Sequence, residues 1–407
     1  MKCRHCNTGL KHVFLDLGIA PPSNAYLSAE ELEQPEKVFP LKLFVCHNCW
    51  LVQTEDYSQR HELFTKEYAY FSSVSSSWLD HAFRYTQMIT DRLNLTKESF
   101  VIEVASNDGY LLKNFVQAGI PCLGIEPTDS TAEAAEKIGI PVIREFFGED
   151  LAKQLVNNGK KADLIIGNNV YAHVPDINDF TKGLKAVLKP GGTITLEFPH
   201  LMNLIQYKQF DTVYHEHYSY LSIYTVDKIF RAAGLKVYDV EELPTHGGSL
   251  RVFGCHLDDA KEISENVTGL KQREKEFGLQ DLPVYLNFQK EADQVTENLL
   301  QFLKEQKQQG KKVGAYGAAA KGNTLLNYGK INSDLVSFVC DAAPSKQGKY
   351  MPGSHIPILH PSALSEQKPD WVLILPWNLE KEIVKQQSQV KEWDGKFLVS
   401  LPELKVI

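Results

Sequence analysis

The fold class follows from one stretch of sequence, Phe100-Val-Ile-Glu-Val-Ala-Ser-Asn-Asp-Gly-Tyr110. Its first residues are apolar and β-branched, which is typical of a buried strand. Small and polar residues follow from Ala105 to Gly109, and a helical pattern comes next, so the strand ends in a tight turn that opens a helix. A strand joined to a helix in this way predicts the first unit of a parallel sheet.

The alternation of strand and helix continues along the chain. The strands of the first unit are expected at residues 100–105, 122–125, 162–167 and 192–198. Two more strand-like runs, 235–240 and 249–257, follow one another without a clear helix, which favours an antiparallel pair at the sheet edge. The strands of a second unit are expected at residues 313–316, 335–340, 371–376 and 397–401. The sequence therefore predicts an α/β protein with two Rossmann-like units.

The composition is that of an ordinary globular protein. The chain has 407 residues, of which 43% are hydrophobic and 23% charged, enough for more than one apolar core. Its net charge of -8 argues against nucleic acid or an anionic membrane as a partner. No apolar run is long enough to span a membrane, and the first residues lack the apolar core of a secretory signal. We therefore expect a cytoplasmic protein that acts on a small molecule.

Four of the seven cysteines form two close pairs. The pairs are Cys3 with Cys6 and Cys46 with Cys49. A turn with this spacing points two thiolates at one position, and two such turns complete the tetrahedral shell that zinc prefers. Four thiolates leave no open coordination position, so the predicted zinc is structural. Four reduced thiols in an apolar interior are the alternative, and His5 or His47 could replace a thiolate.

The turn after the first strand is a candidate cofactor site. In open α/β sheets, ligands bind at the carboxyl ends of the strands, where small residues let the backbone come close. Glu126 follows the second strand, and a carboxylate there can accept hydrogen bonds from both hydroxyls of a ribose. A plain tight turn with a solvated Glu126 is the alternative. Ala105 stands where a glycine is common, so the turn is a weak signal by itself.

Two later stretches distinguish a methyl donor from a dinucleotide. They are Asp163-Leu-Ile-Ile-Gly-Asn-Asn-Val-Tyr-Ala-His-Val174 and Lys189-Pro-Gly-Gly-Thr-Ile-Thr-Leu-Glu197. Both resemble the fourth and fifth strand region of class I S-adenosylmethionine-dependent methyltransferases, in which a Lys-Pro-Gly-Gly turn precedes the fifth strand. The usual nicotinamide-binding motif has no counterpart of this turn. The resemblance implies S-adenosylmethionine as the cofactor.

A group of side chains suited to proton transfer stands at Tyr214-His-Glu-His217. Two imidazoles, a carboxylate and a phenol within four residues can remove, hold and return protons near neutral pH. His173, at the end of the fourth strand, would face the same crevice. Two alternatives remain open. One is a metal site with His215 and His217 as ligands, for which no third ligand is evident, and the other is a solvated loop.

Along its whole length the chain resembles one family, the C-methyltransferases that act on nucleotide-linked keto-deoxysugars. The motifs that carry the resemblance are the four cysteines, Tyr68-Ala-Tyr70, Glu103-Val-Ala-Ser-Asn-Asp-Gly109, Asn168-Asn-Val-Tyr-Ala-His173, Tyr214-His-Glu-His217, His246-Gly-Gly-Ser-Leu-Arg251 and Gly314-Ala-Tyr-Gly-Ala-Ala-Ala-Lys321. The resemblance implies methyl transfer from S-adenosylmethionine to a sugar carbon beside a 4-keto group, typically C-3′ of a dTDP-linked sugar. An O- or N-methyltransferase with another small-molecule substrate is the alternative.

The resemblance also implies roles for individual residues. For proton removal and enolate stabilisation it implies His217 as the base, Tyr214 as the reserve base, and Glu216, His173 and Tyr68 beside them. The implied cofactor residues are Ser106, Asn107, Gly109, Glu126, Phe146 and Asn168. The implied nucleotide-sugar residues are Asn24, Tyr26, His246, Arg251, Tyr316, Lys321 and Asn323. The turn at 317–323 opens a helix whose free N–H groups can hold a diphosphate, with a nicotinamide site as the alternative.

The motifs divide the chain into four parts. These are a zinc-binding module at 1–67, a methyltransferase core at 68–258 with a helical lead-in at 68–99, a helical linker at 259–311, and a Rossmann-like nucleotide-sugar-binding domain at 312–407. The sequence gives no indication of the oligomeric state, and a monomer is compatible with it.

Overall fold

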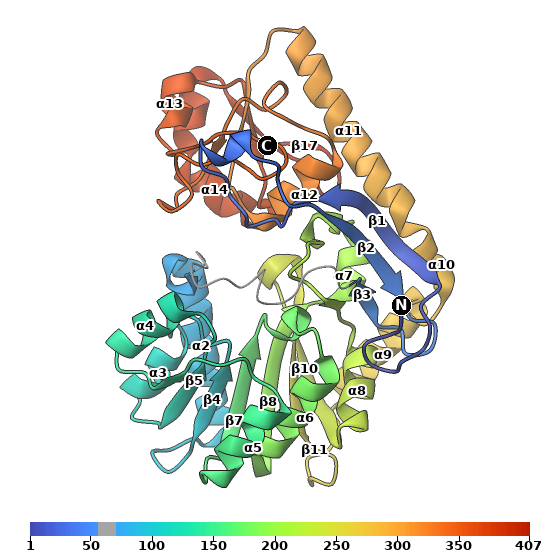
Figure 1. Cartoon of the computed structure of the whole chain (residues 1–407), viewed down its shortest axis with the longest axis vertical. Coiled ribbons are helices and arrows are strands. Elements are labelled where there is room, and N and C mark those ends of the chain that lie inside the picture. Colours follow the sequence, from blue (N-terminus) through green and yellow to red (C-terminus); the bar gives the residue numbers. More distant parts are fainter. Residues whose placement is uncertain (56–70) are drawn as a thin grey trace.

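The structure, a computed structural model, describes residues 1–55 and 71–407. Figure 1 shows two lobes, one above the other, with the carboxyl terminus in the upper lobe. Within the described residues the strands form three sheets, of four, seven and six strands. None of the helices in these two ranges is both long and apolar enough to cross a membrane.

The lower lobe contains the seven-stranded sheet, in the order β10-β11-β8-β7-β4-β5-β6. Its strands are β4 (Val101–Val104), β5 (Cys122–Ile125), β6 (Val142–Ile143), β7 (Ala162–Asn168), β8 (Leu188–Pro199), β10 (Leu235–Leu243) and β11 (Ser249–His256). The strands from β6 to β8 pair in parallel, whereas β11 is antiparallel to both β8 and β10. The predicted parallel core and its antiparallel edge pair are confirmed.

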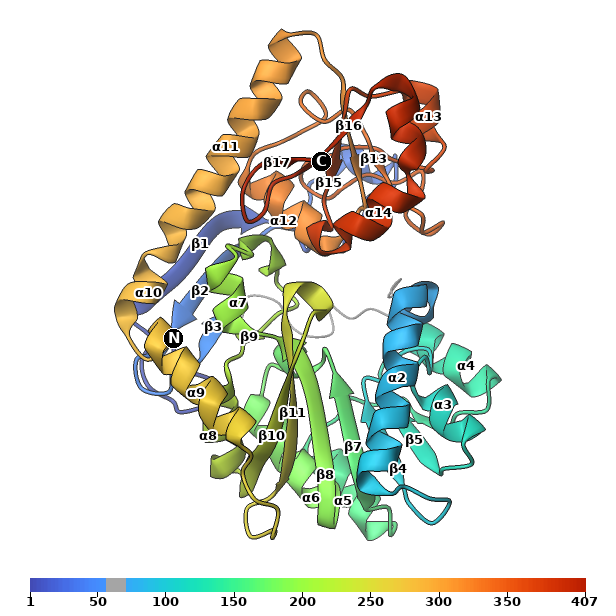
Figure 2. The ribbon, with the colours of Figure 1, turned by 180° about the vertical axis from the view of Figure 1, so that it is seen from behind.

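Helices cover both faces of this sheet, as Figure 2 shows. One face carries α2 (Ser76–Leu93), α3 (Leu112–Gln117) and α4 (Asp129–Lys137), and the other carries α5 (Glu149–Asn157), α6 (Ile177–Val187) and α8 (Ile223–Ala232). Successive residues of β4 point to opposite faces, so Val101 packs under α2 while Ile102 packs under α5 and α6. Burial on both faces explains why three of the four residues of β4 are apolar, and the fourth, Glu103, is itself fully buried.

The four-stranded sheet, in the order β1-β2-β3-β9, holds the amino-terminal segment beside the core. Its strands are β1 (His12–Ala20), β2 (Phe39–Val45), β3 (Val52–Thr54) and β9 (Ser219–Tyr220). Strand β9 comes from the range predicted as the methyltransferase core, directly after the 214–217 cluster. The sheet of the amino-terminal module is therefore completed by the core.

The upper lobe contains the six-stranded sheet, in the order β14-β13-β12-β15-β16-β17. Its elements are β12 (Val313–Tyr316), α12 (Ala320–Tyr328), β13 (Val339–Cys340), β14 (Ile358–Leu359), α13 (Ala363–Gln367), β15 (Trp371–Ile374), α14 (Glu380–Gln386), β16 (Lys396–Val399) and β17 (Lys405–Val406). The strand predicted at 335–340 is shorter, because Leu335 and Val336 donate to the carbonyl of Asn332 in a turn.

Three helices connect the lobes: α9 (Glu265–Phe277), α10 (Leu282–Leu286) and α11 (Phe288–Gln308). Helix α11 runs along the side of the upper lobe in Figure 1. Phe288 at its start stacks on Phe14 of β1, with ring centroids 4.9 Å apart. Glu274 of α9 accepts hydrogen bonds from the backbone of Ile223 and Tyr224 at 2.7 and 3.0 Å, which ties this helix to the start of α8.

Candidate active site

A cavity of about 450 Å³ opens between the two lobes. It lies at the carboxyl ends of β4, β5 and β7 and at the amino-terminal end of α12. Asn24 of the amino-terminal segment reaches it as well. Its volume is that of a small-molecule site, which typically ranges from roughly 300 to 1,000 Å³. Three separate parts of the chain thus contribute to one cavity.

Glu126 lines the cavity at the carboxyl end of β5. Its carboxylate accepts hydrogen bonds from the backbone of Asn107 and of Thr128, each at 3.0 Å. Burial raises the pKa of Glu126. Each carboxylate oxygen has two lone pairs, so acceptor capacity remains for ribose hydroxyls. Phe146 and Phe147 line the same end and offer aromatic surface for an adenine ring.

Asn168 is suited to a polar ligand. It ends β7, lines the cavity and is only 7% exposed. Both its amide nitrogen and its amide oxygen are buried without a hydrogen-bond partner among the described residues. Buried amide groups are almost always paired, so a ligand with both a donor and an acceptor fits this position. Together with Glu126 and Asn107, Asn168 would hold S-adenosylmethionine.

Ser106 and Gly109 do not line the cavity, unlike their neighbour Asn107. Ser106 is fully buried under β5, where a Cβ on Gly124 would lie 2.5 Å from its hydroxyl. Gly109 has a φ of 78°, and a Cβ there would lie 2.3 Å from Ile140. Both residues are small because the turn packs tightly against its own protein. Their roles as cofactor contacts stay a prediction.

Ala105 stands at the strand end where glycine is common, and it has a φ of 58°. An alanine in this region costs roughly 1–2 kcal/mol relative to its ordinary conformation, a cost that glycine avoids. We expect Ala105→Gly to raise the free energy of unfolding by about 1 kcal/mol, as measured by urea denaturation. Ala118→Gly, at a φ of -79°, is the matched control and should not stabilise the protein. A less stable Ala105→Gly variant would contradict strain at this turn.

His173, Tyr214, Glu216 and His217 all line the cavity. The ring of His217 lies 4.0 Å from that of Tyr214 and 4.6 Å from that of His173, measured between centroids. Nδ1 of His217 lies 3.0 Å from the carbonyl oxygen of Thr212. A carbonyl only accepts, so Nδ1 carries the proton and Nε2 keeps the lone pair. The structure therefore presents His217 as a neutral imidazole with a basic Nε2.

The electrostatic environment keeps these imidazoles uncharged. Burial, reinforced by the neighbouring His173, holds the pKa of His217 well below its ordinary value. Burial also lowers the pKa of His173 and of His246 to about 4. A base that stays unprotonated at neutral pH is ready to accept a proton from a substrate.

The histidine loop, residues 213–217, is held from three sides. The hydroxyl of Thr54 in β3 donates to the carbonyl of His217 at 3.3 Å. The amide of Asn24 donates to the carboxylate of Glu216 at 2.8 Å. The hydroxyl of Thr324 in α12 donates to the carbonyl of Val213 at 2.7 Å. Strand β3, the segment around Asn24 and helix α12 of the upper lobe thus each fix part of this loop.

Two lysines line the cavity at the upper lobe. Lys321, in the first turn of α12, donates to the side-chain oxygen of Asn378 at 2.8 Å and lies over the ring of Trp377. Lys346 donates to the carbonyl of Ala318 at 2.8 Å. Positive charge and the free N–H groups of a helix start favour an anionic group such as a diphosphate.

Four of the predicted sugar-binding residues lie outside the cavity walls, and each has a partner within the chain. Tyr26 donates to the carbonyl of Ala318 at 2.6 Å, Asn323 donates to that of Ser23 at 2.7 Å, Tyr316 accepts from Gln387 at 3.1 Å, and Arg251 pairs with Glu197 at 2.8 Å. Their roles as substrate contacts stay a prediction. Tyr68, which was also predicted to contribute to the site, lies outside the described residues.

Several cavity residues were not predicted from the sequence: Trp78, Asn169, Lys346 and Asn378. Trp78 stands at the start of α2, and its ring stacks on that of His81 at 4.8 Å. Lys346 follows β13 of the upper sheet, in the region where open α/β sheets bind ligands. The strand-end rule could have found Lys346, whereas nothing local marks Trp78 or Asn378.

The four paired cysteines lie together, with all their Sγ atoms within 4.8 Å of one another. The Sγ atoms of Cys3 and Cys49 are 3.5 Å apart, as are those of Cys6 and Cys46. A tetrahedral zinc with Zn–S bonds of about 2.3 Å would place the sulfurs about 3.8 Å apart, so the cluster fits zinc. His5 instead lies 2.8 Å from the side-chain oxygen of Asn178, so cysteines rather than histidine form the ligand set.

His173 and His246, which are half-buried, make the stability depend on pH. The pKa of His173 and of His246 is about 4 in the folded protein, against about 6.5 in an unfolded chain. Between these values the unfolded state binds more protons, so stability falls as the pH drops from about 6.5 to 4, by up to about 1.4 kcal/mol per pH unit for each histidine. We expect His173→Asn to flatten the dependence of the unfolding free energy on pH. An unchanged slope would contradict this assignment.

Comparisons with known proteins agree with this geometry. Residues 3–64 match a zinc binding domain, residues 78–240 a methyltransferase domain, and residues 244–402 the C-methyltransferase C-terminal domain. The C-methyltransferase NovU of Streptomyces niveus is 32% identical over 406 residues, which cover 100% of this chain and 96% of that protein. An uncharacterized methyltransferase of Mycobacterium leprae is 27% identical over 99 residues, or 24% of this chain and 36% of that protein.

Similar solved structures are also methyltransferases. The 1,6-didemethyltoxoflavin-N1-methyltransferase of Burkholderia thailandensis is 16% identical with a TM-score of 0.38, covering 51% of this chain and 96% of that one. The magnesium protoporphyrin IX methyltransferase of Synechocystis is 15% identical with a TM-score of 0.33, covering 44% and 77%. On the strength of its full-length relative and its matched domains, the chain belongs to the S-adenosylmethionine-dependent C-methyltransferase family.

Proposed function

We propose that the enzyme methylates a nucleotide-linked 4-keto-deoxysugar, and specifically that it methylates C-3′ of a dTDP-linked sugar, next to the ketone. The observation that carries the proposal is the position of His217. Its basic Nε2 belongs to a cavity that also holds the cofactor residues Asn168 and Glu126 and the cationic end of α12. A base, a methyl-donor site and an anion site in one cavity suit this substrate class.

Carbon methylation needs a base for a chemical reason. A carbon that bears hydrogen is not nucleophilic until the proton is removed, and a neighbouring ketone lowers the cost because the charge spreads onto its oxygen as an enolate. S-adenosylmethionine supplies the methyl group on a positively charged sulfur. The protein has to bring base, ketone and methyl donor together and to exclude water.

The residues of the histidine loop divide this work. We assign proton removal to Nε2 of His217, with Tyr214 as the reserve base and Glu216 as a residue that keeps the loop in place through Asn24. His173, whose ring is 4.6 Å from that of His217, would stand beside the ketone. The family resemblance adds Tyr68 to this group.

The nucleotide would bind at the upper lobe. Lys321 and Lys346 supply positive charge beside the start of α12, which suits a diphosphate. Asn24, whose neighbour Ser23 accepts a hydrogen bond from Asn323 of α12, would contact the sugar. In this arrangement the sugar lies between the diphosphate site and the base.

The test is exchange of the substrate proton with solvent. The enzyme, with S-adenosylhomocysteine in place of the methyl donor, is incubated in deuterated water with a dTDP-linked 4-keto-deoxysugar, and NMR follows the hydrogen at C-3′. We expect enzyme-dependent exchange at that carbon. If the bound keto-sugar keeps its C-3′ hydrogen, the proposed deprotonation is wrong. Calorimetric titration with dTDP, GDP, CDP and UDP identifies the nucleotide.

A further inference from the structure

His246 occupies a strained turn at the mouth of the cavity. It belongs to the short helix η5 (Thr245–Gly247), which connects β10 to β11. Its φ of 53° is unfavourable for a residue other than glycine. The turn is fixed on both sides, since a Cβ on Gly247 would lie 2.3 Å from Trp377 and one on Gly248 would lie 2.2 Å from Asn203. Strain that the surroundings enforce is a feature of functional sites.

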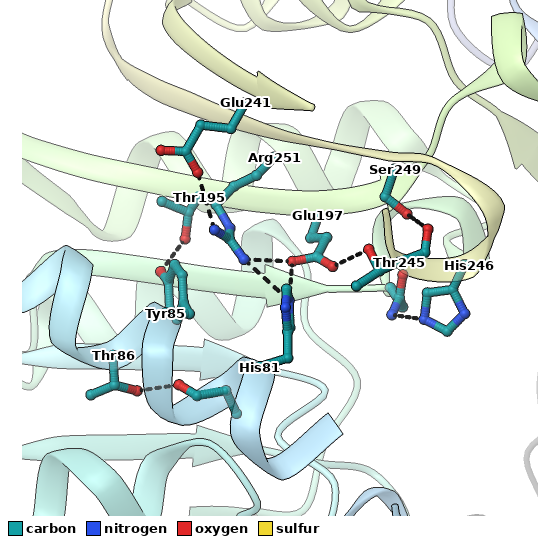
Figure 3. Close-up of polar contacts among 12 residues, drawn as sticks. His81, Tyr85, Thr86, Thr195, Glu197, Glu241, Thr245, His246, Ser249 and Arg251 are labelled. Atoms are coloured by element: carbon teal, nitrogen blue, oxygen red, sulfur yellow. Dashed lines mark hydrogen bonds and ion pairs between the residues drawn. The ribbon is translucent and has the colours of Figure 1, made fainter. Parts of the chain in front are cut away.

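The proton of the His246 ring is placed by Asn169. Figure 3 shows the imidazole turned toward an amide, and the distance from Nδ2 of Asn169 to Nε2 of His246 is 3.0 Å. An amide nitrogen only donates, so Nε2 accepts and Nδ1 carries the proton. Both rings carry their proton on Nδ1. In His246 the nitrogen that Asn169 leaves available is this N–H donor, whereas in His217 the available nitrogen is Nε2 with its lone pair.

A buried ion-pair network is hydrogen-bonded to this turn through Thr245 (Figure 3). The hydroxyl of Thr245 donates to Glu197 at 2.9 Å, and the other carboxylate oxygen of Glu197 binds Arg251 at 2.8 Å and His81 at 2.9 Å. Burial acts to raise the pKa of Glu197, but the hydrogen bond with His81 and the charge of Arg251 outweigh it and keep Glu197 ionised. The network joins α2, β8 and β11 behind His246.

The surroundings of His246 suit an oxygen that becomes negative. The positive charge of Lys321 acts on His246 and would favour a negative oxygen beside it, whereas the charge of Glu197 behind the turn acts in the opposite sense. Trp78 covers its ring edge-on, with centroids 5.3 Å apart. Burial keeps the ring neutral, and a neutral imidazole donates a hydrogen bond without giving up its proton.

We propose that His246 is a catalytic residue that donates a hydrogen bond from Nδ1 to the ketone oxygen of the substrate and to the enolate oxygen that replaces it. The inference rests on the proposed function. As the C–H bond breaks, its proton passes to Nε2 of His217 and its electron pair spreads onto the oxygen that His246 contacts. The carbon then forms a bond to the methyl group and the ketone re-forms. The electron pair of the methyl–sulfur bond, which breaks in this step, stays on sulfur.

The test separates the two ring nitrogens. In His246→Asn the amide nitrogen takes the place of Nδ1, and asparagine tolerates the positive φ. In His246→Gln the amide takes the place of Nε2, so the donor into the cavity is lost. We expect His246→Gln to slow solvent exchange at C-3′ by about 10²- to 10³-fold, the usual effect of losing one oxyanion donor, while His246→Asn stays within about tenfold of the wild type.

His256→Gln, at the other end of β11, is the matched control and should exchange at the wild-type rate. Affinity for S-adenosylhomocysteine, measured by calorimetry, should be unchanged in all three variants, which shows that they are folded. Equal exchange rates in His246→Gln and the wild type would overturn the role of His246 while leaving the proposed function intact. Failure of the wild type to exchange would overturn the proposed function itself.

Discussion

His217→Asn is expected to lower kcat about 10³-fold, within the range of 10²- to 10⁴-fold that general base catalysis contributes. The amide of asparagine can keep the hydrogen bond to the carbonyl of Thr212, but it has no lone pair of sufficient basicity to stand in for Nε2. The loop should therefore keep its shape while losing its base. Steady-state kinetics and solvent exchange at C-3′ measure the loss.

The control for this prediction is His215→Asn in the same loop. His215 faces the amino-terminal sheet, where its Nε2 lies 3.2 Å from the carbonyl oxygen of Phe39, and it does not line the cavity. Its replacement should change turnover far less than that of His217. Affinity for S-adenosylhomocysteine should be close to that of the wild type in both variants. A parallel loss of this affinity in His217→Asn would argue for a cofactor contact rather than a base.

Removal of zinc is expected to have the largest effect on stability. Structural zinc sites bind with apparent free energies of roughly 10–16 kcal/mol in small domains, and this energy supports the fold. Chelation or Cys46→Ser should lower the melting temperature strongly, and turnover should fall with it, because β3 pairs with β9 directly after His217. Thermal unfolding and zinc content measure the effect.

Cys340→Ser is the matched control for the zinc prediction, since this cysteine is buried in the upper lobe, away from the four ligands. It should keep the zinc content and most of the stability. Added zinc should restore the chelated wild type but not Cys46→Ser. A metal-free protein with normal stability and turnover would show that the four thiolates have no structural role.

The parallel core could be predicted because its strands are determined locally. The apolar run at residues 164–167 is buried on both faces, so it identifies β7 without knowledge of its neighbours. The carboxyl ends of such strands then indicate a ligand site. This is why Asn107, Glu126 and Asn168, which line the cavity, could be predicted as site residues. The zinc ligands could also be predicted, because the spacing of the four cysteines is itself the signal.

Other features of the site could not be predicted, because they depend on packing between distant segments. Gly109 is small to make room for Ile140, and nothing in the sequence distinguishes this from room for a ligand. Arg251 looks like an anion-binding residue until its buried partner Glu197 is known. Trp78 and Asn378 reach the cavity only because the two lobes meet there.

The three attachments of the histidine loop have a consequence for how the protein folds. They join residues that are 163, 192 and 111 positions apart in the chain. Contacts of such large sequence separation form late, because the entropy of closing long loops has to be overcome first. During refolding from denaturant, we therefore expect turnover to recover after the helices and the core sheet have re-formed.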